Sequence, residues 1–208
     1  MSMQTPGGQP TLPTEPALRQ RVLDAALALM IEQGVAHTTT LAVQKRAGVS
    51  RGALLHHFPT RAQLLSATVE ALVARNEAAV MAMMREQGSA GDGFEQAIRA
   101  LAYMCEQPPF LAELELWATA RVDEDLRAAL IAAERHAQPH MERVVSALFA
   151  PVAHQPGQAA VRALTVELLR GLALSGVLRR SATRREGLVQ QWVQAARLLL
   201  AHWPPPPN

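Results

Sequence analysis

Apolar residues recur at intervals of three and four along most of this chain, which is the spacing of one face of an α-helix. The first such stretch covers residues 17–33 and stops at Gly34. Two short stretches, 50–58 and the preceding 40–47, are followed by a long one over 60–86. Further helical patterns cover 94–106, 109–120, 123–149, 157–180 and 184–202, with proline, glycine or capping residues between them. The pattern predicts an all-α fold of about nine helices.

Both ends of the chain lack this pattern. Residues 1–16 are rich in Pro, Gly, Thr and Gln, and predict a disordered arm. Residues 204–208 contain four consecutive prolines, which cannot continue a helix, and predict a disordered tail. We divide the remainder into an N-terminal domain, 17–62, and a larger C-terminal domain, 63–203. No flexible linker separates them, so we expect the boundary to fall within the helix that follows Thr60.

The composition supports helices and a sizeable core. Hydrophobic residues make up 49% of the chain and aromatic residues only 4%, while runs of β-branched residues are rare. The single cysteine, Cys105, excludes an internal disulfide and suits a reducing compartment. The start of the chain does not resemble a secretory signal, and no apolar run is long enough for a membrane span. We therefore expect a cytoplasmic protein with no membrane partner.

Residues 38–58 carry the most informative local pattern, which is two short helices meeting at a tight corner. Ala47 is small enough for the helices to approach closely, and Gly48 permits the positive φ of a sharp helix end. Val49 fills the angle between the helices, and Ser50 is a typical residue to cap the second. This arrangement predicts a helix-turn-helix, whose second helix lies in the major groove of DNA.

Local charge supports a DNA contact, although the chain as a whole has a net charge of only +2. Between Leu41 and Ala62 every charged residue is basic. We expect Arg51 to bind a guanine edge or a phosphate, Ala53 to touch a thymine methyl group, and Gly52 to allow close approach. The candidate DNA-binding residues are Thr39, Lys45, Ser50, Arg51, Gly52, Ala53, His56, His57 and Arg61.

These residues belong to a longer run that resembles the tetracycline-repressor (TetR) family. The run comprises RVLDAA at 21–26, Gly34, Thr39, AGVS at 47–50, HFPTR at 57–61 and the pair Leu64 and Leu65. The resemblance implies a homodimer that binds an inverted-repeat operator in double-stranded DNA. It also implies a C-terminal domain that binds a small-molecule effector and then releases the DNA. Leu55 stands where the family usually has a tyrosine that holds a phosphate, and Gln44 replaces a small alanine.

An apolar effector cavity is predicted from flexible sulfur-containing and aromatic side chains, which adapt to varied ligands. Ordinary core packing is the alternative for each of them. Either Glu113 or Glu115 faces inward to a polar ligand group, or both lie on a solvated face. The candidate cavity residues are Met81, Met84, Phe94, Met104, Phe110, Glu113, Trp117 and Met141.

The last two helical patterns carry long apolar stripes that predict a dimer interface, in which each helix pairs with its copy. Gly171 and Gly176 would let these helices pack closely. The alternative is that the stripes face the core of their own domain. The candidate interface residues are Val161, Leu164, Leu168, Leu172, Leu188, Trp192, Ala195 and Leu199.

Enzymatic activity finds no support, because the sequence lacks a nucleophile–base pattern, a phosphate loop and a pair of supported carboxylates. No cofactor is predicted. His136 and His140 are four residues apart, as in some metal sites, but lack further suitable ligands nearby, so no metal is predicted. The sequence predicts a ligand-responsive repressor. The alternative is a helical protein-interaction module without DNA-binding activity.

Overall fold

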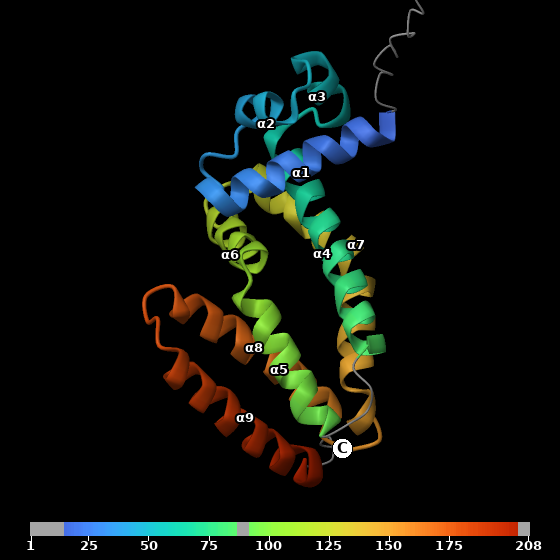
Figure 1. The fold of residues 1–208 in the computed structure, drawn as a ribbon, viewed down its shortest axis with the longest axis vertical. Coiled ribbons are helices and arrows are strands. Elements are labelled where there is room, and N and C mark those ends of the chain that lie inside the picture. The colour runs from blue at the N-terminus through green and yellow to red at the C-terminus, as the bar shows by residue number, and fades with distance from the viewer. Residues whose placement is uncertain (1–14, 87–91, 204–208) are drawn as a thin grey trace, which may run out of the picture.

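The computed structural model describes residues 15–86 and 92–203, with the backbone alone at 76 and 79–86. All regular structure in these ranges is helical, as predicted (Figure 1). A single 3-10 turn, Ala150–Val152, follows the seventh helix. The α-helices are α1 (Glu15–Gln33), α2 (Thr40–Ala47), α3 (Arg51–His57), α4 (Arg61–Glu86), α5 (Gly93–Glu106), α6 (Pro108–Ala120), α7 (Glu124–Leu148), α8 (Gln158–Gly176) and α9 (Ala182–His202).

The predicted helix ranges agree closely with these bounds, and they differ most at the end of α8 and at the start of α1. Helix α8 ends at Gly176, whereas the pattern extended to 180. Helix α1 begins at Glu15, so the predicted arm overlaps it by two residues. Pro16 is tolerated there because the first turn of a helix has no N–H partner to lose. The predicted tail, 204–208, and the rest of the arm lie outside the described residues.

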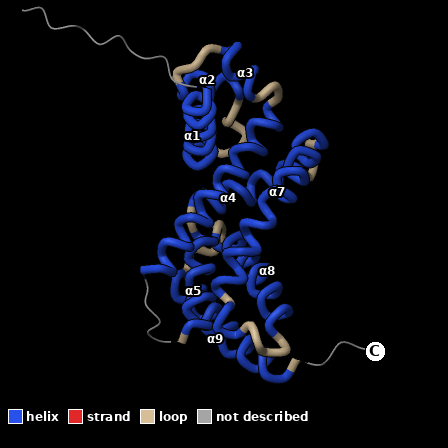
Figure 2. The backbone as a smooth tube through the Cα atoms, turned by 90° about the vertical axis from the view of Figure 1, so that its right-hand side faces the viewer, coloured by secondary structure: helices blue, strands red, loops and turns tan. Residues whose placement is uncertain are grey.

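Helices α1, α2 and α3 form a head at one end of the molecule, seated on the start of α4 (Figures 1 and 2). This head has its own buried core, and Val43, Ala47, Leu54 and Phe58 belong to it as predicted. Val49 is half-buried against the same core. The small core therefore positions α3 with its other face outward.

Helices α4 and α7 lie side by side and run in the same direction (Figure 1). The Ser66 hydroxyl near the start of α4 donates to the Ala129 carbonyl at 3.0 Å. Further along, Glu70 faces His136, and Glu77 faces His140. Helices α4 and α7 together connect the head to the rest of the molecule, which we call the body.

Two more cores fill the body. The middle one joins the end of α1 to α4, α6 and α7, and includes Met30, Val35, Leu65 and Leu116. The other joins α5 to the end of α7, α8 and α9. Because Met30 and Val35 share a core with α6, the head packs directly against the body.

The apolar stripes of α8 and α9 divide between their own core and the outside. Val161 is fully buried within the same chain, so its assignment to a dimer interface is wrong. The inward face of α8 consists of residues four apart, namely Val161, Thr165, Leu169 and Ala173. Trp192 packs on this core, and its indole N–H donates to the Thr165 hydroxyl at 2.9 Å.

A second set of apolar side chains on these two helices and the turn between them is exposed. Leu164 is 45% exposed and Ala195 is also exposed, while Leu168, Leu172, Leu188 and Leu199 are half-buried. The structure adds larger exposed side chains that the predicted stripes omit. These are Leu174, Val177, Leu178 and Leu198.

Candidate DNA-binding surface and effector cavity

The corner between α2 and α3 has the geometry that its residues predict. The Thr39 hydroxyl accepts a hydrogen bond from the Ala42 N–H at 3.1 Å and caps α2. Gly48 ends that helix in the left-handed region, with φ 64° and ψ 41°. The Ser50 hydroxyl accepts from the Ala53 N–H at 3.1 Å and caps α3. The backbone groups at this corner are thus paired locally, which fixes the angle between the helices.

Two side chains of α1, Arg21 and Glu32, form hydrogen bonds with the end of α2 at this corner. The Arg21 guanidinium donates to the Ala47 carbonyl at 2.6 Å, just before the turn. Arg46 forms two parallel hydrogen bonds to the Glu32 carboxylate, each at 2.6 Å. These contacts restrict the orientation of α2, and they occupy one of the four basic side chains near the corner.

The other predicted DNA-binding residues lie mostly on the open side of the head. Lys45 and Arg51 are exposed, and neither forms an ion pair with any residue in the described ranges. His56 is exposed, with its Nε2 atom 3.6 Å from Glu15 Oε1. Thr39, Ser50 and Gly52 are exposed as well, while Ala53 and His57 are half-buried. Lys45 and Arg51 therefore keep their charges free for an external anion.

Arg61 has a different role from the predicted phosphate contact. Its Nε–H donates to the Thr38 carbonyl at 3.0 Å, and its Nη2 donates to the Val35 carbonyl. The side chain therefore holds the turn between α1 and α2. The sequence alone could not show this, because both partners lie more than twenty residues earlier in the chain.

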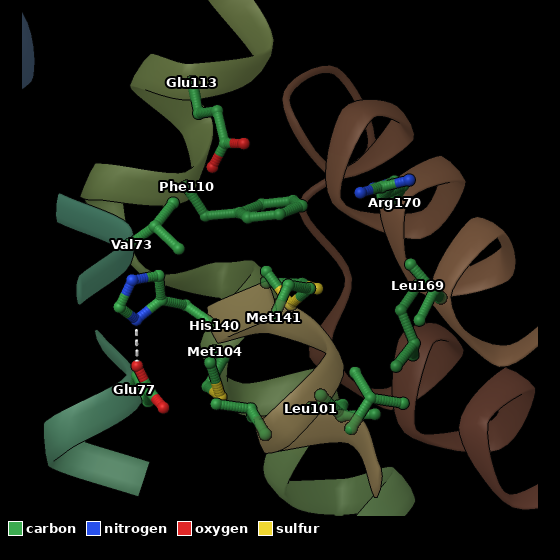
Figure 3. Close-up of a pocket in the computed structure, with 14 residues that line it drawn as sticks. Val73, Glu77, Leu101, Met104, Phe110, Glu113, His140, Met141, Leu169 and Arg170 are labelled. Carbon is green, nitrogen blue, oxygen red and sulfur yellow. Dashed lines mark hydrogen bonds and ion pairs between the residues drawn. The ribbon is translucent and has the colours of Figure 1, made fainter. Parts of the chain in front are cut away.

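A cavity lies between α4, α5, α6, α7 and α8 (Figure 3). Met104, Phe110, Glu113 and Met141 line it, as predicted for an effector site. Its unfilled space is about 50 Å³. The residues that the prediction missed are Val73, Glu77, Leu101, Cys105, His140, Val144, Val145, Val166, Leu169 and Arg170.

The remaining predicted cavity residues fall elsewhere. Phe94 packs edge-on against Phe149 in the core, with ring centroids 6.0 Å apart. The Trp117 indole donates to Glu134 at 3.2 Å, and the Arg170 guanidinium covers its ring at 4.8 Å. Neither aromatic side chain lines the cavity. Met81 and Met84 fall in the stretch whose side chains are outside the described residues.

Glu77 and His140 close one side of the cavity (Figure 3). The Glu77 carboxylate accepts from the Arg143 Nε–H at 2.6 Å and also pairs with His140. The hydrogen bonds from Arg143 and then His140 lower the pKa of Glu77 to about 2. This carboxylate is therefore ionised and already neutralised by groups of α7.

Glu113 differs from Glu77, because no residue in the described ranges forms a hydrogen bond or an ion pair with its carboxyl. Its side chain is almost fully buried, with 8% of the residue exposed. Burial, followed by the nearby Glu134 charge, raises the pKa of Glu113 to about 7, against a smaller opposing effect of Arg170. Burial likewise raises the pKa of the Cys105 thiol to about 11, which makes this cavity residue a poor nucleophile.

Helix α6 connects this cavity to the head. Glu115, two residues after Glu113, accepts a hydrogen bond from the Val35 N–H at 2.8 Å. The neighbouring Gly34 has φ 83°, and a Cβ atom there would lie 3.0 Å from Glu115 Oε1. A displacement of α6 by a ligand would therefore act directly on the turn that Arg61 also holds.

Metal and membrane functions gain no support from the described part of the chain. His136 and His140 each face a different glutamate of α4, and no group of three potential metal ligands forms there. None of the described helices combines the length and the apolar character that crossing a membrane requires.

Comparisons with known proteins converge on one class. Residues 22–68 match the family model of bacterial regulatory proteins, tetR family. The chain is 38% identical over 64 residues to the HTH-type transcriptional regulator BetI of Serratia proteamaculans (strain 568), covering 31% of this chain and 32% of that protein. It is 33% identical over 110 residues to the regulator CymR of Pseudomonas putida, covering 53% of this chain and 54% of that protein. The matches thus span between a third and about half of these curated relatives.

Similarity of fold extends over nearly the whole chain. A solved structure of the multidrug binding protein EbrR complexed with imidazole superposes with a TM-score of 0.61. It covers 95% of this chain and 99% of that chain, at 23% sequence identity. The head and the helical body therefore occur together in a known fold.

Proposed function

We propose that this chain, whose N-terminal domain belongs to the TetR family of bacterial regulatory proteins, is a ligand-responsive transcriptional repressor. The observation that carries the proposal is the corner at 39–50, where hydrogen bonds from Thr39 and Ser50 cap both helices. This corner leaves one face of α3 exposed, and Arg51 on that face has no ion pair in the described residues. A recognition helix with a free arginine and the small Gly52 suits direct contact with base edges in a major groove. The curated relatives are regulators rather than enzymes, in agreement with the lack of a catalytic pattern.

The operator of a dimeric repressor would be an inverted repeat with half-sites about one helical turn apart. The exposed apolar residues of α8 and α9 support a dimer, because a monomer seldom leaves so many large apolar side chains in water. Leu164, Leu174 and Leu198 are the strongest candidates for contact with the second copy.

The cavity of the body is the proposed effector site. Its lining of methionine, leucine, valine and phenylalanine suits a largely apolar small molecule. The fold is shared with EbrR, which is described as a multidrug binding protein, and this supports a ligand-binding role for the body. Helix α6 contributes Phe110 and Glu113 to the cavity and Glu115 to the head, so it offers a short route from ligand to DNA-binding surface.

The test is an anisotropy titration of the purified protein against a labelled duplex that carries the DNA flanking its own gene. We expect affinity to fall steeply with salt, because arginine and lysine displace counterions from phosphates. Arg51→Ala should weaken binding at least tenfold, since one good base contact is worth about 1–3 kcal/mol and a dimer loses two. Helical content should stay unchanged.

Arg135→Ala is the matched control, because Arg135 is also exposed but lies in the middle of α7, away from the head. It should leave DNA affinity within about twofold of the unsubstituted protein, since a distant exposed charge is largely screened by salt. Equal losses for both substitutions would remove Arg51 from the recognition role. Failure of any duplex to bind in a salt-dependent manner would favour a protein-interaction module instead.

A further inference from the structure

The cavity holds one buried carboxyl group, that of Glu113, to which the described residues supply no ion pair. Figure 3 shows the Glu113 side chain descending from α6 toward the ring of Phe110 and the centre of the cavity. Among the residues that the structure describes, none forms a hydrogen bond or an ion pair with this carboxyl. An unpaired polar group in an apolar site costs free energy, which a suitable ligand can recover.

The other charged groups of the cavity are already engaged. Glu77 is bound by Arg143 and His140. Arg170 forms an ion pair with Glu167 at 2.7 Å, and its guanidinium face lies against Trp117. The Nε atom of Arg170 is buried without an acceptor, but its positive charge is balanced. Among the charged groups that line the cavity, Glu113 is therefore the carboxyl without a hydrogen-bond or ion-pair partner in the described residues.

Resting on the effector role proposed above, we infer that the cavity takes an organic ammonium compound with an apolar, preferably aromatic, body. The ammonium group would meet the Glu113 carboxylate and supply the missing ion pair and hydrogen bonds. The face of Phe110 lies beside that carboxyl and would add a favourable contact with a cation. The body of the ligand would lie among Met104, Met141 and Leu169.

Binding requires the cavity to enlarge. Its 50 Å³ of free space is far below the roughly 300 Å³ at the lower end of small-molecule sites. Met104 and Met141 are unbranched and have several rotatable bonds, so they can move at low cost. Helix α6, which contributes Phe110 and Glu113 to the cavity wall, also carries Glu115.

The proposal includes a dependence on pH. Because burial raises the pKa of Glu113 to about 7, the free protein holds a proton on this carboxyl in about half of the molecules near neutral pH. An ammonium ligand favours the ionised form, so its affinity should increase as the pH rises from 6 to 8. The other titratable or charged groups that line the cavity or lie around Glu113 are Glu77 of α4, Cys105 of α5, Glu134, Arg135, His140 and Glu142 of α7, and Arg170 of α8.

The test uses three probes with the same skeleton and different charges: 4-phenylbutylamine, 4-phenylbutanol and 4-phenylbutyrate. Calorimetric titration of the full chain without DNA should rank the amine at least tenfold tighter than the alcohol, with the butyrate weakest. Glu113→Gln keeps the shape and removes the charge. It should abolish the advantage of the amine and its increase between pH 6 and pH 8, while the alcohol binds as before.

Glu124→Gln is the control, because Glu124 is an exposed carboxylate at the start of α7, outside the cavity. It should keep the ranking of the unsubstituted protein. Tightest binding of the butyrate would assign the cavity to an anion at Arg170, and equal binding of all three probes would remove the charge selectivity. Either result overturns the proposal, as does an amine preference that survives Glu113→Gln. DNA binding by the ligand-free Glu113→Gln protein should stay unchanged, and its loss in every variant would instead count against the proposed function.

Discussion

The corner between α2 and α3 and the cavity of the body differ in how far apart their interacting groups lie along the chain. At the corner, Thr39 pairs with Ala42 and Ser50 with Ala53, three residues away in each case. In the cavity, Glu77 pairs with Arg143, 66 residues away, and Glu113 has no hydrogen-bond or ion-pair partner among the residues that the structure describes. The caps that shape the corner are short-range, and the longer-range hydrogen bond from Arg21 to the Ala47 carbonyl adds to them. The site that must respond to a ligand depends on long-range contacts and retains an unpaired group.

Substitution of a glycine in each region makes the comparison quantitative. Gly157→Ala in the body should lower the free energy of unfolding more than Gly48→Ala at the corner. A Cβ atom at Gly157, at the start of α8, would lie 2.3 Å from the Leu199 carbonyl oxygen and 2.9 Å from the Leu200 Cα atom. Since backbone atoms cannot rotate away, Gly157→Ala should force α8 and α9 apart. We expect a loss of about 3 kcal/mol or more in the free energy of unfolding, measured by urea titration.

Gly171→Ala serves as the comparison for that measurement. A Cβ atom at Gly171 would meet nothing within 4 Å in the same chain, and the residue lies inside α8. The helix propensity of alanine should therefore stabilise the protein by up to about 1 kcal/mol. If Gly157→Ala proves as harmless as Gly171→Ala, the close contact between α8 and α9 is not present in solution.

The unpaired carboxyl should have a smaller effect on stability, and one that depends on pH. The pKa of Glu113 is raised from 4.5 to about 7, so folding is favoured while the group holds its proton. That stability is fully present below about pH 4.5 and is lost as the pH rises through 7. The stability of Glu113→Gln relative to the unsubstituted protein should thus be greater at pH 8 than at pH 5, by about 2–3 kcal/mol, because the cost of burying the amide is the same at both values of pH.

Urea titrations of the unsubstituted and Glu113→Gln proteins at both values of pH give this difference directly. Glu124→Gln provides the reference for the change of pH itself, because Glu124 is exposed and paired with Arg127. A Glu113→Gln protein whose relative stability is the same at pH 5 and pH 8 would show that this carboxyl is not buried as described.

The same contrast in range explains what the sequence could predict. Caps and the left-handed glycine at 48 depend on residues within one turn, so the corner was predicted correctly, residue by residue. The sequence assigns Arg61 to a phosphate of DNA from its place at the start of a helix, and it cannot reveal the actual partners at Thr38 and Val35, because these are close only after folding. Periodicity identified the apolar faces of α8 but could not separate Val161, which faces its own core, from Leu164, which is exposed. The sequence identifies Glu113 as a candidate cavity residue. That its carboxyl is buried without a partner in the described residues depends on how α4 to α8 meet around it.

The corner itself supplies the smallest and most specific prediction. Gly48 has φ 64°, and an added Cβ would meet only the end of Arg21 at an ordinary 3.4 Å. Gly48→Ala should therefore cost only the strain of a left-handed alanine, about 1 kcal/mol, seen as a lower melting temperature by circular dichroism. DNA affinity should fall as well, because the angle between α2 and α3 changes when the strain is relieved.

Gly52→Ala separates the two consequences, because Gly52 lies on the exposed face of α3 and a Cβ there meets nothing within 4 Å. Alanine should raise the stability of this helix by up to about 1 kcal/mol. Its methyl group nevertheless lies on the face proposed to enter the major groove, so DNA affinity should fall. If Gly48→Ala lowers stability, Gly52→Ala raises it and both lower DNA affinity, then Gly48 is required for the shape of the corner and Gly52 for contact with DNA. A Gly52→Ala protein that is stabilised and binds DNA unchanged would place the recognition surface elsewhere on the head.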